Sequence, residues 1–183
     1  MRSAHRKRLP VTAEPLPKGS PSTAEERNIA VLKCAYAAWD ASKGADRTVW
    51  TQLVAPAFLM HSLAQGVPPL EFTARICCPA DLERYFEGLA RDWSMNFFRI
   101  DRYVAQGSMV VAIGECSFTH RRTGKTVTTP KLDAFKFLNG EIVEVSELYD
   151  TALVMAAATP DAAGGAKREH RLADGLSDRL GSP

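Results

Sequence analysis

The sequence lacks the groups from which most metal and disulfide sites are built. Its four cysteines, Cys34, Cys77, Cys78 and Cys116, show no C-x-x-C spacing, and the adjacent pair suits neither a disulfide framework nor a zinc site. The four histidines are too scattered to form a metal set by spacing. We therefore expect reduced cysteines that serve as packing residues, and no metal or other cofactor.

A long apolar run is also missing. No stretch approaches the roughly 20 apolar residues that cross a bilayer. Residues 1–21 begin with basic side chains, but no apolar segment follows them, as a secretory signal would require. The sequence predicts a soluble, cytoplasmic protein with no membrane contact.

The positive charge of the chain lies outside its central part. Residues 1–21 carry five basic side chains and one acidic one, and residues 159–183 carry four of each sign. The net charge of +2 therefore leaves −2 for residues 22–158. A nucleic-acid-binding domain needs basic side chains on its folded surface, so we expect no nucleic-acid partner. The Pro-rich leader 1–21 and the tail 159–183 are predicted to be disordered around one folded domain, 22–158.

Three helices are predicted in the first half of this domain. Capping-box patterns at Ser22 and Thr23 begin the first, which should end near Lys43, before a glycine. The second should run over 48–54, after the capping residue Asp46. The third should run over 80–93, where apolar side chains recur at helical spacing. Residues 57–63 between them are interpreted as a loop-like entry to the core.

Four strands are predicted in the second half, over residues 97–105, 109–120, 126–138 and 141–149. The links between them are short enough for hairpins, and Asn139-Gly140 is a strong signal for a type I′ turn. Helices followed by such a meander predict an α+β fold, in which three N-terminal helices pack on a curved antiparallel sheet. The space between them would be a cone with an apolar pocket. From Ala156 onward the core pattern is lost, and a mobile tail is expected.

The most informative residue is Asp133, in the strand 126–138. Because side chains alternate along a strand, Asp133 shares one face with Phe135 and Phe137. If that face lines the interior, burial should raise the pKa of this carboxyl and suit it to acid/base chemistry. The alternative is that the face meets solvent, or that Asp133 caps a neighbouring amide.

The hairpin leaves two alternatives for the neighbour of Asp133. With a regular two-residue turn, Asp133 pairs with Ser146, which would then face the pocket. A bulge would reverse the parity and bring Glu147 inward instead.

The motifs K-L-D-A-F-K-F-x-N-G-E-I-V-E and E-L-Y-D-T-A resemble the SnoaL-like polyketide cyclase and ketosteroid isomerase superfamily, with its nuclear transport factor 2-like cone fold. The resemblance covers roughly residues 25–157. It implies that Asp133 takes the position of an acid/base or oxyanion-hole aspartate, and that His61 takes the position of the catalytic base. The family's oxyanion-hole tyrosine aligns with Ala35, so Tyr36 is expected one residue out of phase, about 100° around the helix. Steroid isomerase activity itself is therefore not expected.

The resemblance implies three alternative functions. The first is a cofactor-independent isomerase or aldol-type cyclase acting on a small apolar carbonyl compound, with Asp133 and His61 as catalytic residues. The second is a non-catalytic module for ligand binding or dimerisation. The third is an epoxide hydrolase or dehydratase, which usually needs further carboxyl groups or a second histidine at the site, and His120 is the one spare candidate. Expected substrate-binding residues are Tyr36, Trp39, Met60, Trp93, Phe135, Phe137 and Ser146.

A homodimer formed through the outer face of the sheet is also expected. This face is predicted from Val110, Ala112 and Phe118 in the strand 109–120, because such sheets commonly pack against a second copy in the superfamily.

Overall fold

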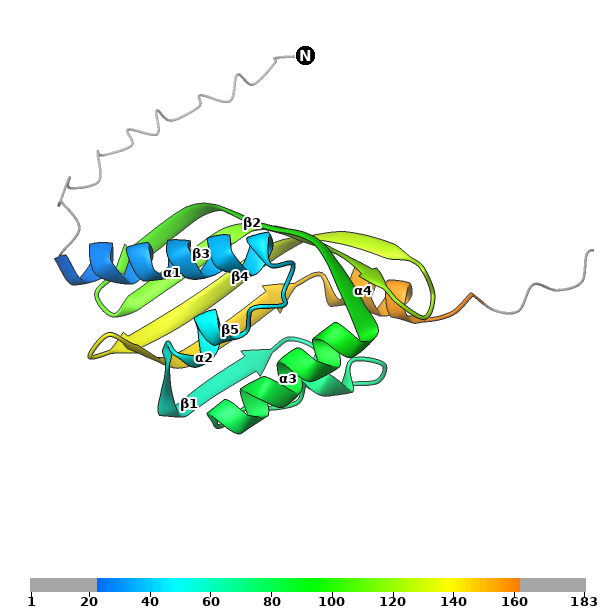
Figure 1. The fold of residues 1–183 in the computed structure, drawn as a ribbon, viewed down its shortest axis with the longest axis horizontal. Helices are drawn as coiled ribbons and strands as arrows, with labels where there is room; N and C mark the ends of the chain where they lie inside the picture. Colours follow the sequence, from blue (N-terminus) through cyan, green and yellow to red (C-terminus); the bar gives the residue numbers. More distant parts are fainter. Residues whose placement is uncertain (1–22, 162–183) are drawn as a thin grey trace, which may run out of the picture.

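The computed structural model describes residues 23–161 as an α+β domain (Figure 1). Its elements, in order, are α1 (Thr23–Ala41), α2 (Thr48–Thr51), β1 (Val54–Ser62), a short 3-10 turn η1 (Glu71–Thr73), α3 (Pro79–Asp92), β2 (Trp93–Gln106), β3 (Met109–His120), β4 (Thr126–Leu138), β5 (Glu141–Tyr149) and α4 (Thr151–Ala158). None of the helices in these residues is long and apolar enough to span a membrane.

The five strands form one mixed sheet in the order β1-β5-β4-β3-β2. The pairs β2·β3, β3·β4 and β4·β5 are antiparallel, as expected for a meander of hairpins. Strands β3, β4 and β5 have the predicted bounds, and Asn139 and Gly140 both adopt positive φ (53° and 87°), as a type I′ turn requires. The Asn-Gly signal therefore identified the hairpin correctly.

Strand β1 corrects the expectation of a loop over residues 57–63. It pairs in parallel with β5, so the sheet is mixed and not wholly antiparallel. A proline usually argues against a strand, but Pro56 lies where the β1·β5 register shifts, between Val54 and Leu59. No regular ladder bond is lost there, and β1 is an edge strand, where proline is tolerated.

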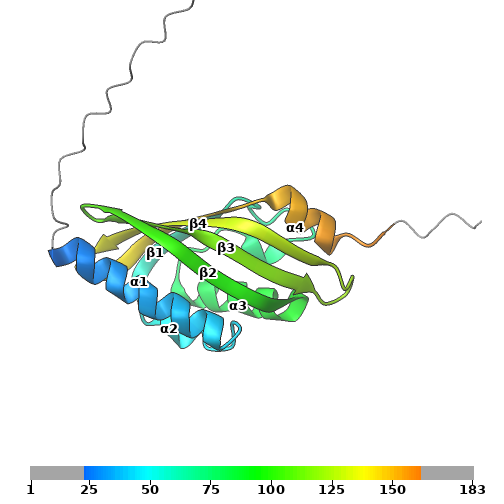
Figure 2. The ribbon, with the colours of Figure 1, turned by 90° about the horizontal axis from the view of Figure 1, so that it is seen from above.

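The helices α1, α2 and α3 cover one face of the sheet (Figures 1 and 2). Along β4 the side chains alternate, and Val127, Thr129, Lys131, Asp133, Phe135 and Phe137 are buried on the inner side. Helix α3 ends at Asp92, so Trp93 begins β2 and does not belong to the predicted third helix. The core therefore lies between the inner side of the sheet and the helices.

The outer side of the sheet differs from the prediction. Val110 and Ala112 are fully buried on the inner side, and Phe118 also packs against the core, so these residues do not form a surface for a second copy. The outer side instead carries Ile113, Leu132 and Leu148, which lie opposite one another on β3, β4 and β5. Leu132 and Leu148 are 37% and 38% exposed.

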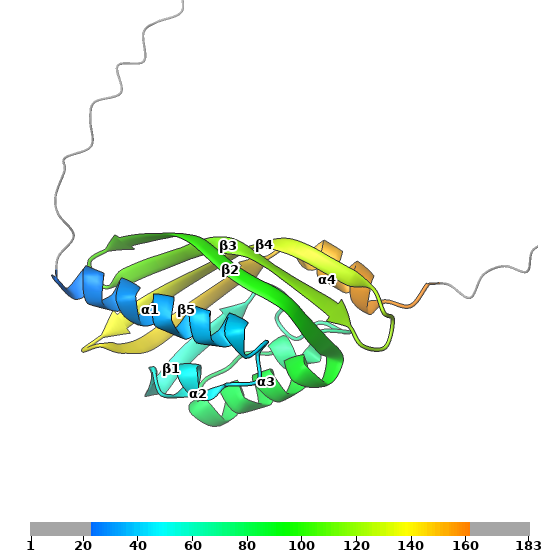
Figure 3. The ribbon, with the colours of Figure 1, turned by 45° about the horizontal axis from the view of Figure 1, so that its top comes forward.

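Helix α4 corrects the expectation of a mobile tail from Ala156. Asp150 caps this helix, because its Oδ1 accepts a hydrogen bond from Leu153 N at 3.0 Å. Ala157 and Ala158 are buried, and the helix lies beside the link between β3 and β4, where Thr123 Oγ1 donates to Ala157 O (Figure 3). The predicted leader 1–21 and the tail from 162 onward lie outside the described residues.

The strands β2 and β3 approach each other closely at Gly114. The register of the β2·β3 pair shifts between Ile100 and Arg102, opposite Gly114. A Cβ at Gly114 would lie 1.9 Å from the backbone oxygen of Arg99. Only glycine allows β2 to approach this closely, and the bulge bends the strand around the core.

We predict that Gly114→Ala destabilises the domain by about 3 kcal/mol, because the backbone of β2 must move to admit the methyl group. The matched control is Gly124→Ala, where φ is +69° and nothing lies within 4 Å of the new Cβ. That change should cost only about 1 kcal/mol of left-handed strain. Urea unfolding of both variants measures the difference; equal losses would show that the close approach does not constrain the sheet.

Candidate active site

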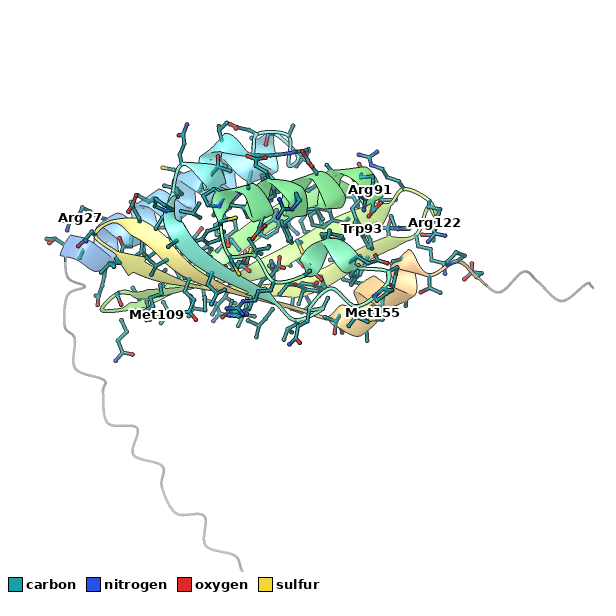
Figure 4. All side chains as sticks on the ribbon, turned by 90° about the horizontal axis from the view of Figure 1, so that it is seen from below. Arg27, Arg91, Trp93, Met109, Arg122 and Met155 are labelled. Atoms are coloured by element: carbon teal, nitrogen blue, oxygen red, sulfur yellow. The ribbon has the colours of Figure 1, made fainter. Side chains whose placement is uncertain are left out.

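A cavity of about 130 Å³ lies between the inner side of the sheet and the helices. Its wall is almost wholly apolar and rich in aromatic rings. The sheet provides Phe98, Phe118, Phe135, Val145 and Tyr149, and the helices provide Tyr36, Trp39, Trp50, Tyr85, Phe86 and Leu89. Trp93, at the start of β2, also lines the cavity, and Figure 4 shows it near Arg91 and Arg122.

A cluster of three charged side chains, Lys131, Asp133 and Glu147, interrupts this apolar wall. Lys131 and Asp133 are two residues apart on β4, so both face inward, and Glu147 lies opposite Asp133 on β5. The Lys131 ammonium lies 2.9 Å from Asp133 Oδ1 and 2.6 Å from Glu147 Oε1. The side chains are only 4%, 8% and 9% exposed, in that order. One buried cation is thus shared by two carboxyl groups.

Two tyrosines from the helices complete this cluster. Tyr36 on α1 donates its hydroxyl to Asp133 Oδ2 at 2.5 Å. Tyr85 on α3 donates to Glu147 Oε1 at 2.8 Å. The expectation that Tyr36 points away is therefore wrong: the alignment assigned the inward position to Ala35, but the phase of α1 brings both Ala35 and Tyr36 into the core.

The environments of the two carboxyl groups shift their pKa values in opposite directions. Burial raises the pKa of Asp133, and the neighbouring Glu147 adds to this, against Lys131 and the Tyr36 hydroxyl. Burial acts on Glu147 in the same sense, but the Lys131 ammonium, with Ser62 and Tyr85, outweighs it and lowers the pKa of Glu147. Two carboxyl groups with separated pKa values are typical of acid/base sites.

The other titratable groups in the cavity wall stay protonated. Despite burial, the two carboxylates raise the pKa of Lys131, so it remains an ammonium and cannot act as a nucleophilic amine. Burial raises the pKa of Tyr36 and Tyr85 well above the ordinary value, and that of the Cys116 thiol to about 12. Hence the phenols act as hydrogen-bond donors, and the thiol is inert at neutral pH.

Several residues proposed from the sequence do lie together in the cavity wall. They are Asp133, Tyr36, Trp39, Met60, Trp93 and Phe135. Phe137 is buried in the same core but does not line the cavity. The position of Asp133 on the inner face follows the parity of β4, as the sequence indicated.

His61 and Ser146 do not lie in the cavity wall. Along β1 the side chains alternate, so Met60 faces inward and His61 is exposed on the outer side. Ser146 is paired with both His61 and Ala134, and shares their side of the sheet. The expectation that His61 faces Asp133 is therefore wrong, because residues one position apart on a strand point to opposite faces.

The bulge in the hairpin explains why Glu147 replaces Ser146. The β4·β5 register shifts between Lys136 and Phe137, so Asp133 pairs with Glu147. This is the second alternative left open by the sequence. Lys131 and Tyr85 were missed, although Lys131 shares the parity of Asp133 and Phe135 and could have been found from it. Tyr85 lies on the inner face of α3, one residue before Phe86.

No group of three metal-binding side chains occurs within residues 23–161. His120, the other histidine considered, packs edge-on against Trp93 with ring centroids 4.8 Å apart. Its Nδ1 is 3.1 Å from the hydroxyl of Thr123, and it does not line the cavity. Among the described residues, the charged side chains of the cavity wall are therefore those of the cluster, Lys131, Asp133 and Glu147.

Comparison with known proteins gives the same fold. A model of the SnoaL-like domain matches residues 35–145. A nuclear transport factor 2-like protein from Burkholderia thailandensis is 27% identical, with a TM-score of 0.62 over 73% of this chain and 98% of that one. A protein from Jannaschia sp., provisionally named a SnoaL-like polyketide cyclase, is 15% identical, with a TM-score of 0.61 over 78% and 99%.

A further solved structure contains a small ligand. A protein with a ketosteroid isomerase-like fold from Catenulispora acidiphila, solved with trimethylamine, is 13% identical, with a TM-score of 0.57 over 69% of this chain and 93% of that one. No curated protein matches the sequence significantly.

We predict that Lys131→Met destabilises the domain by about 3–5 kcal/mol at pH 7, because two buried carboxyl groups lose their cation. Without it, the folded-state pKa values of Asp133 and Glu147 should both lie above their unfolded values. Such groups favour folding below the unfolded pKa, and this contribution is lost as the pH rises. The penalty should therefore be small near pH 4 and grow towards pH 7.

Urea unfolding at several pH values measures this penalty. Lys136→Met is the matched control, because Lys136 lies on the same strand but is exposed on the outer side. It should change stability little at any pH. A penalty for Lys131→Met that is constant with pH would contradict a cation shared by two carboxylates.

Proposed function

We propose that this chain, which belongs to the SnoaL-like domain family, is a cofactor-independent proton-transfer enzyme. Its reaction is an isomerisation or aldol-type cyclisation of a small carbonyl compound bound in the apolar cavity. The observation that carries the proposal is Asp133, a buried carboxyl group with a raised pKa in the wall of that cavity. A base of raised pKa is suited to take a proton near neutral pH.

In the proposed reaction, ionised Asp133 takes a proton from the carbon next to the substrate carbonyl. The electron pair of the broken C–H bond moves into the carbonyl group and forms an enolate. In an isomerase, protonated Asp133 then returns the proton to another carbon. In a cyclase, the enolate carbon attacks a second carbonyl group, and the resulting alkoxide takes the proton from Asp133.

Lys131 supports this step because the net charge of the cluster and substrate together does not change. The negative charge leaves Asp133 and appears on the enolate oxygen, while the Lys131 ammonium stays 2.9 Å from the Asp133 carboxyl group. In a wall that is otherwise apolar, a fixed cation stabilises such a charge more than water would. Tyr36 holds Asp133 in place through its short hydrogen bond.

The alternative function is non-catalytic binding of a small apolar ligand. The aromatic wall of the cavity favours it, since such a wall needs no chemistry to hold a ligand. The hydrolase or dehydratase alternative, which needs further carboxyl groups or a second histidine at the site, loses both histidines, because neither His61 nor His120 lines the cavity, but Glu147 gives it a second carboxyl group beside Asp133. Turnover distinguishes catalysis of either kind from binding alone.

We predict that the protein exchanges protons next to the carbonyl of small aryl ketones with D₂O, and that Asp133→Asn slows this exchange about 10²–10⁴-fold. Proton NMR measures how fast the signal of the protons next to the ketone carbonyl is lost. Asp101→Asn is the matched control, since Asp101 lies exposed on β2. His61→Ala should also leave the rate unchanged. Saturable binding of these ketones without exchange above the buffer rate would support the binding module instead.

We also propose a homodimer through the outer side of the sheet. The row Ile113, Leu132 and Leu148 gives an apolar stripe across three strands. A two-fold axis would place this stripe against itself and bury it in both copies.

We predict that light scattering during size-exclusion chromatography gives twice the mass of one chain, and that Leu132→Glu converts the protein to a monomer. The control is Leu138→Glu at the hairpin end of β4, where Leu138 is 60% exposed and outside the stripe. A wild-type protein that elutes with the mass of a single chain at high concentration would contradict the dimer.

A further inference from the structure

Glu147 has one carboxylate oxygen that no group within residues 23–161 satisfies. Its Oε1 accepts from Lys131 Nζ at 2.6 Å and from Tyr85 OH at 2.8 Å. Its Oε2 is buried and has no hydrogen-bond partner in the described part of the chain. The Ser62 hydroxyl lies near Glu147 and helps to lower its pKa, but the hydrogen bond of this hydroxyl is with Tyr149 OH, at 3.1 Å. A buried carboxylate oxygen without a partner is costly, so a donor from outside the protein should occupy this position.

The charges around Glu147 restrict the chemistry of that donor. An anionic ligand would add a further negative charge beside Asp133 and Glu147, which already share a single cation. A cationic ligand would lie close to the Lys131 ammonium, and it is not needed for charge balance when Asp133 is protonated, the form that its burial and raised pKa favour. Because the rest of the wall is apolar, either charge would also lose its hydration. The donor therefore belongs to a neutral molecule.

The cavity limits the size of that molecule. A volume of about 130 Å³ is close to that of apolar cavities in proteins that hold one benzene ring. The wall contains many aromatic side chains, Trp50 and Phe135 among them, against which a flat ring can pack. One ring with short substituents fills the space.

We propose that the ligand of this cavity is a small neutral compound with a single ring that carries a hydroxyl group as well as its carbonyl group, and that Glu147 Oε2 accepts the hydrogen bond of that hydroxyl. The carbonyl part of this statement rests on the proposed proton-transfer function. The hydroxyl part rests only on Glu147 and the cavity, and it holds for a binding module as well.

The test compares ligands that differ only in whether the ring carries a hydroxyl group, which can donate a hydrogen bond, or a methyl group, which cannot. Binding of meta- and para-hydroxyacetophenone is measured by isothermal titration calorimetry beside the matching methylacetophenones, which have similar shape but no O–H. Hydrogen bonds to charged groups are strong, so at least one hydroxyl isomer should bind roughly 10–100-fold tighter than its methyl partner. The anion meta-hydroxybenzoate and the cation phenyltrimethylammonium should bind more weakly than that isomer.

The variant Glu147→Gln tests whether Glu147 causes the preference for hydroxyl ligands. Lys131 and Tyr85 both donate to the Oε1 position, so the glutamine oxygen should occupy it and place the NH₂ group where Oε2 was. The site would then offer an NH₂ donor in place of a charged acceptor, and because the ligand hydroxyl could only accept a weaker, neutral hydrogen bond from it, the hydroxyl preference should fall several-fold. Glu144→Gln, on the same strand but paired with the exposed Lys136, should keep the preference. Thermal melting of each variant checks that it is folded.

Equal binding of hydroxyl and methyl ligands to the wild-type protein would overturn the proposal, and this comparison does not depend on any variant. Tighter binding of the anion or the cation would overturn it too, as would an undiminished hydroxyl preference in folded Glu147→Gln. The acetyl protons of the same ligands report exchange with D₂O. A hydroxyl preference without exchange would support the Glu147 site and contradict the proton-transfer function, so the two failures are distinguishable.

Discussion

The buried ammonium of Lys131 is the interaction on which the rest of the site depends. A lysine removed from water pays a desolvation cost of several kcal/mol, which only close counter-charges can offset. Asp133 and Glu147 provide them at 2.9 and 2.6 Å. The pairing is unequal, because one cation cannot neutralise two carboxylates. This inequality separates the pKa of Glu147, which is lowered, from that of Asp133, which is raised.

The layers of the fold meet at this cluster. Strands β4 and β5 carry the three charges, whereas the hydroxyls of Tyr36 and Tyr85 reach them from α1 and α3. Each helix is thus fixed to the sheet by a buried hydrogen bond as well as by apolar packing. The same bonds orient Asp133 and Glu147 in the cavity wall, so the geometry of the site follows from how the helices pack on the sheet.

Local sequence patterns predicted the parts of the molecule that local physics determines. The Asn139-Gly140 turn gave the hairpin, and alternation along β4 placed Asp133 on the inner face. The errors came from features that depend on distant contacts. The bulge beside Phe137 exchanged Ser146 for Glu147, and the parallel pairing of β1 with β5 turned His61 outward. The phase of α1, which brings Tyr36 to Asp133, is set by packing against the sheet. Lys131 was missed for a different reason. A lysine is rarely buried unless it is paired with carboxyl groups, and the sequence did not show that Glu147 would lie beside it.

The central claim is that Asp133 is a desolvated carboxyl group poised for acid/base chemistry. Carbon-13 NMR of labelled aspartate side chains, assigned with Asp133→Asn, measures its pKa directly. The structure predicts a pKa above the ordinary value, because burial and Glu147 outweigh Lys131 and Tyr36. It also predicts a further rise in Tyr36→Phe, where a hydrogen bond to the ionised form is lost. A pKa at or below the ordinary value in the wild-type protein would show that Lys131 fully neutralises Asp133, and would contradict the account.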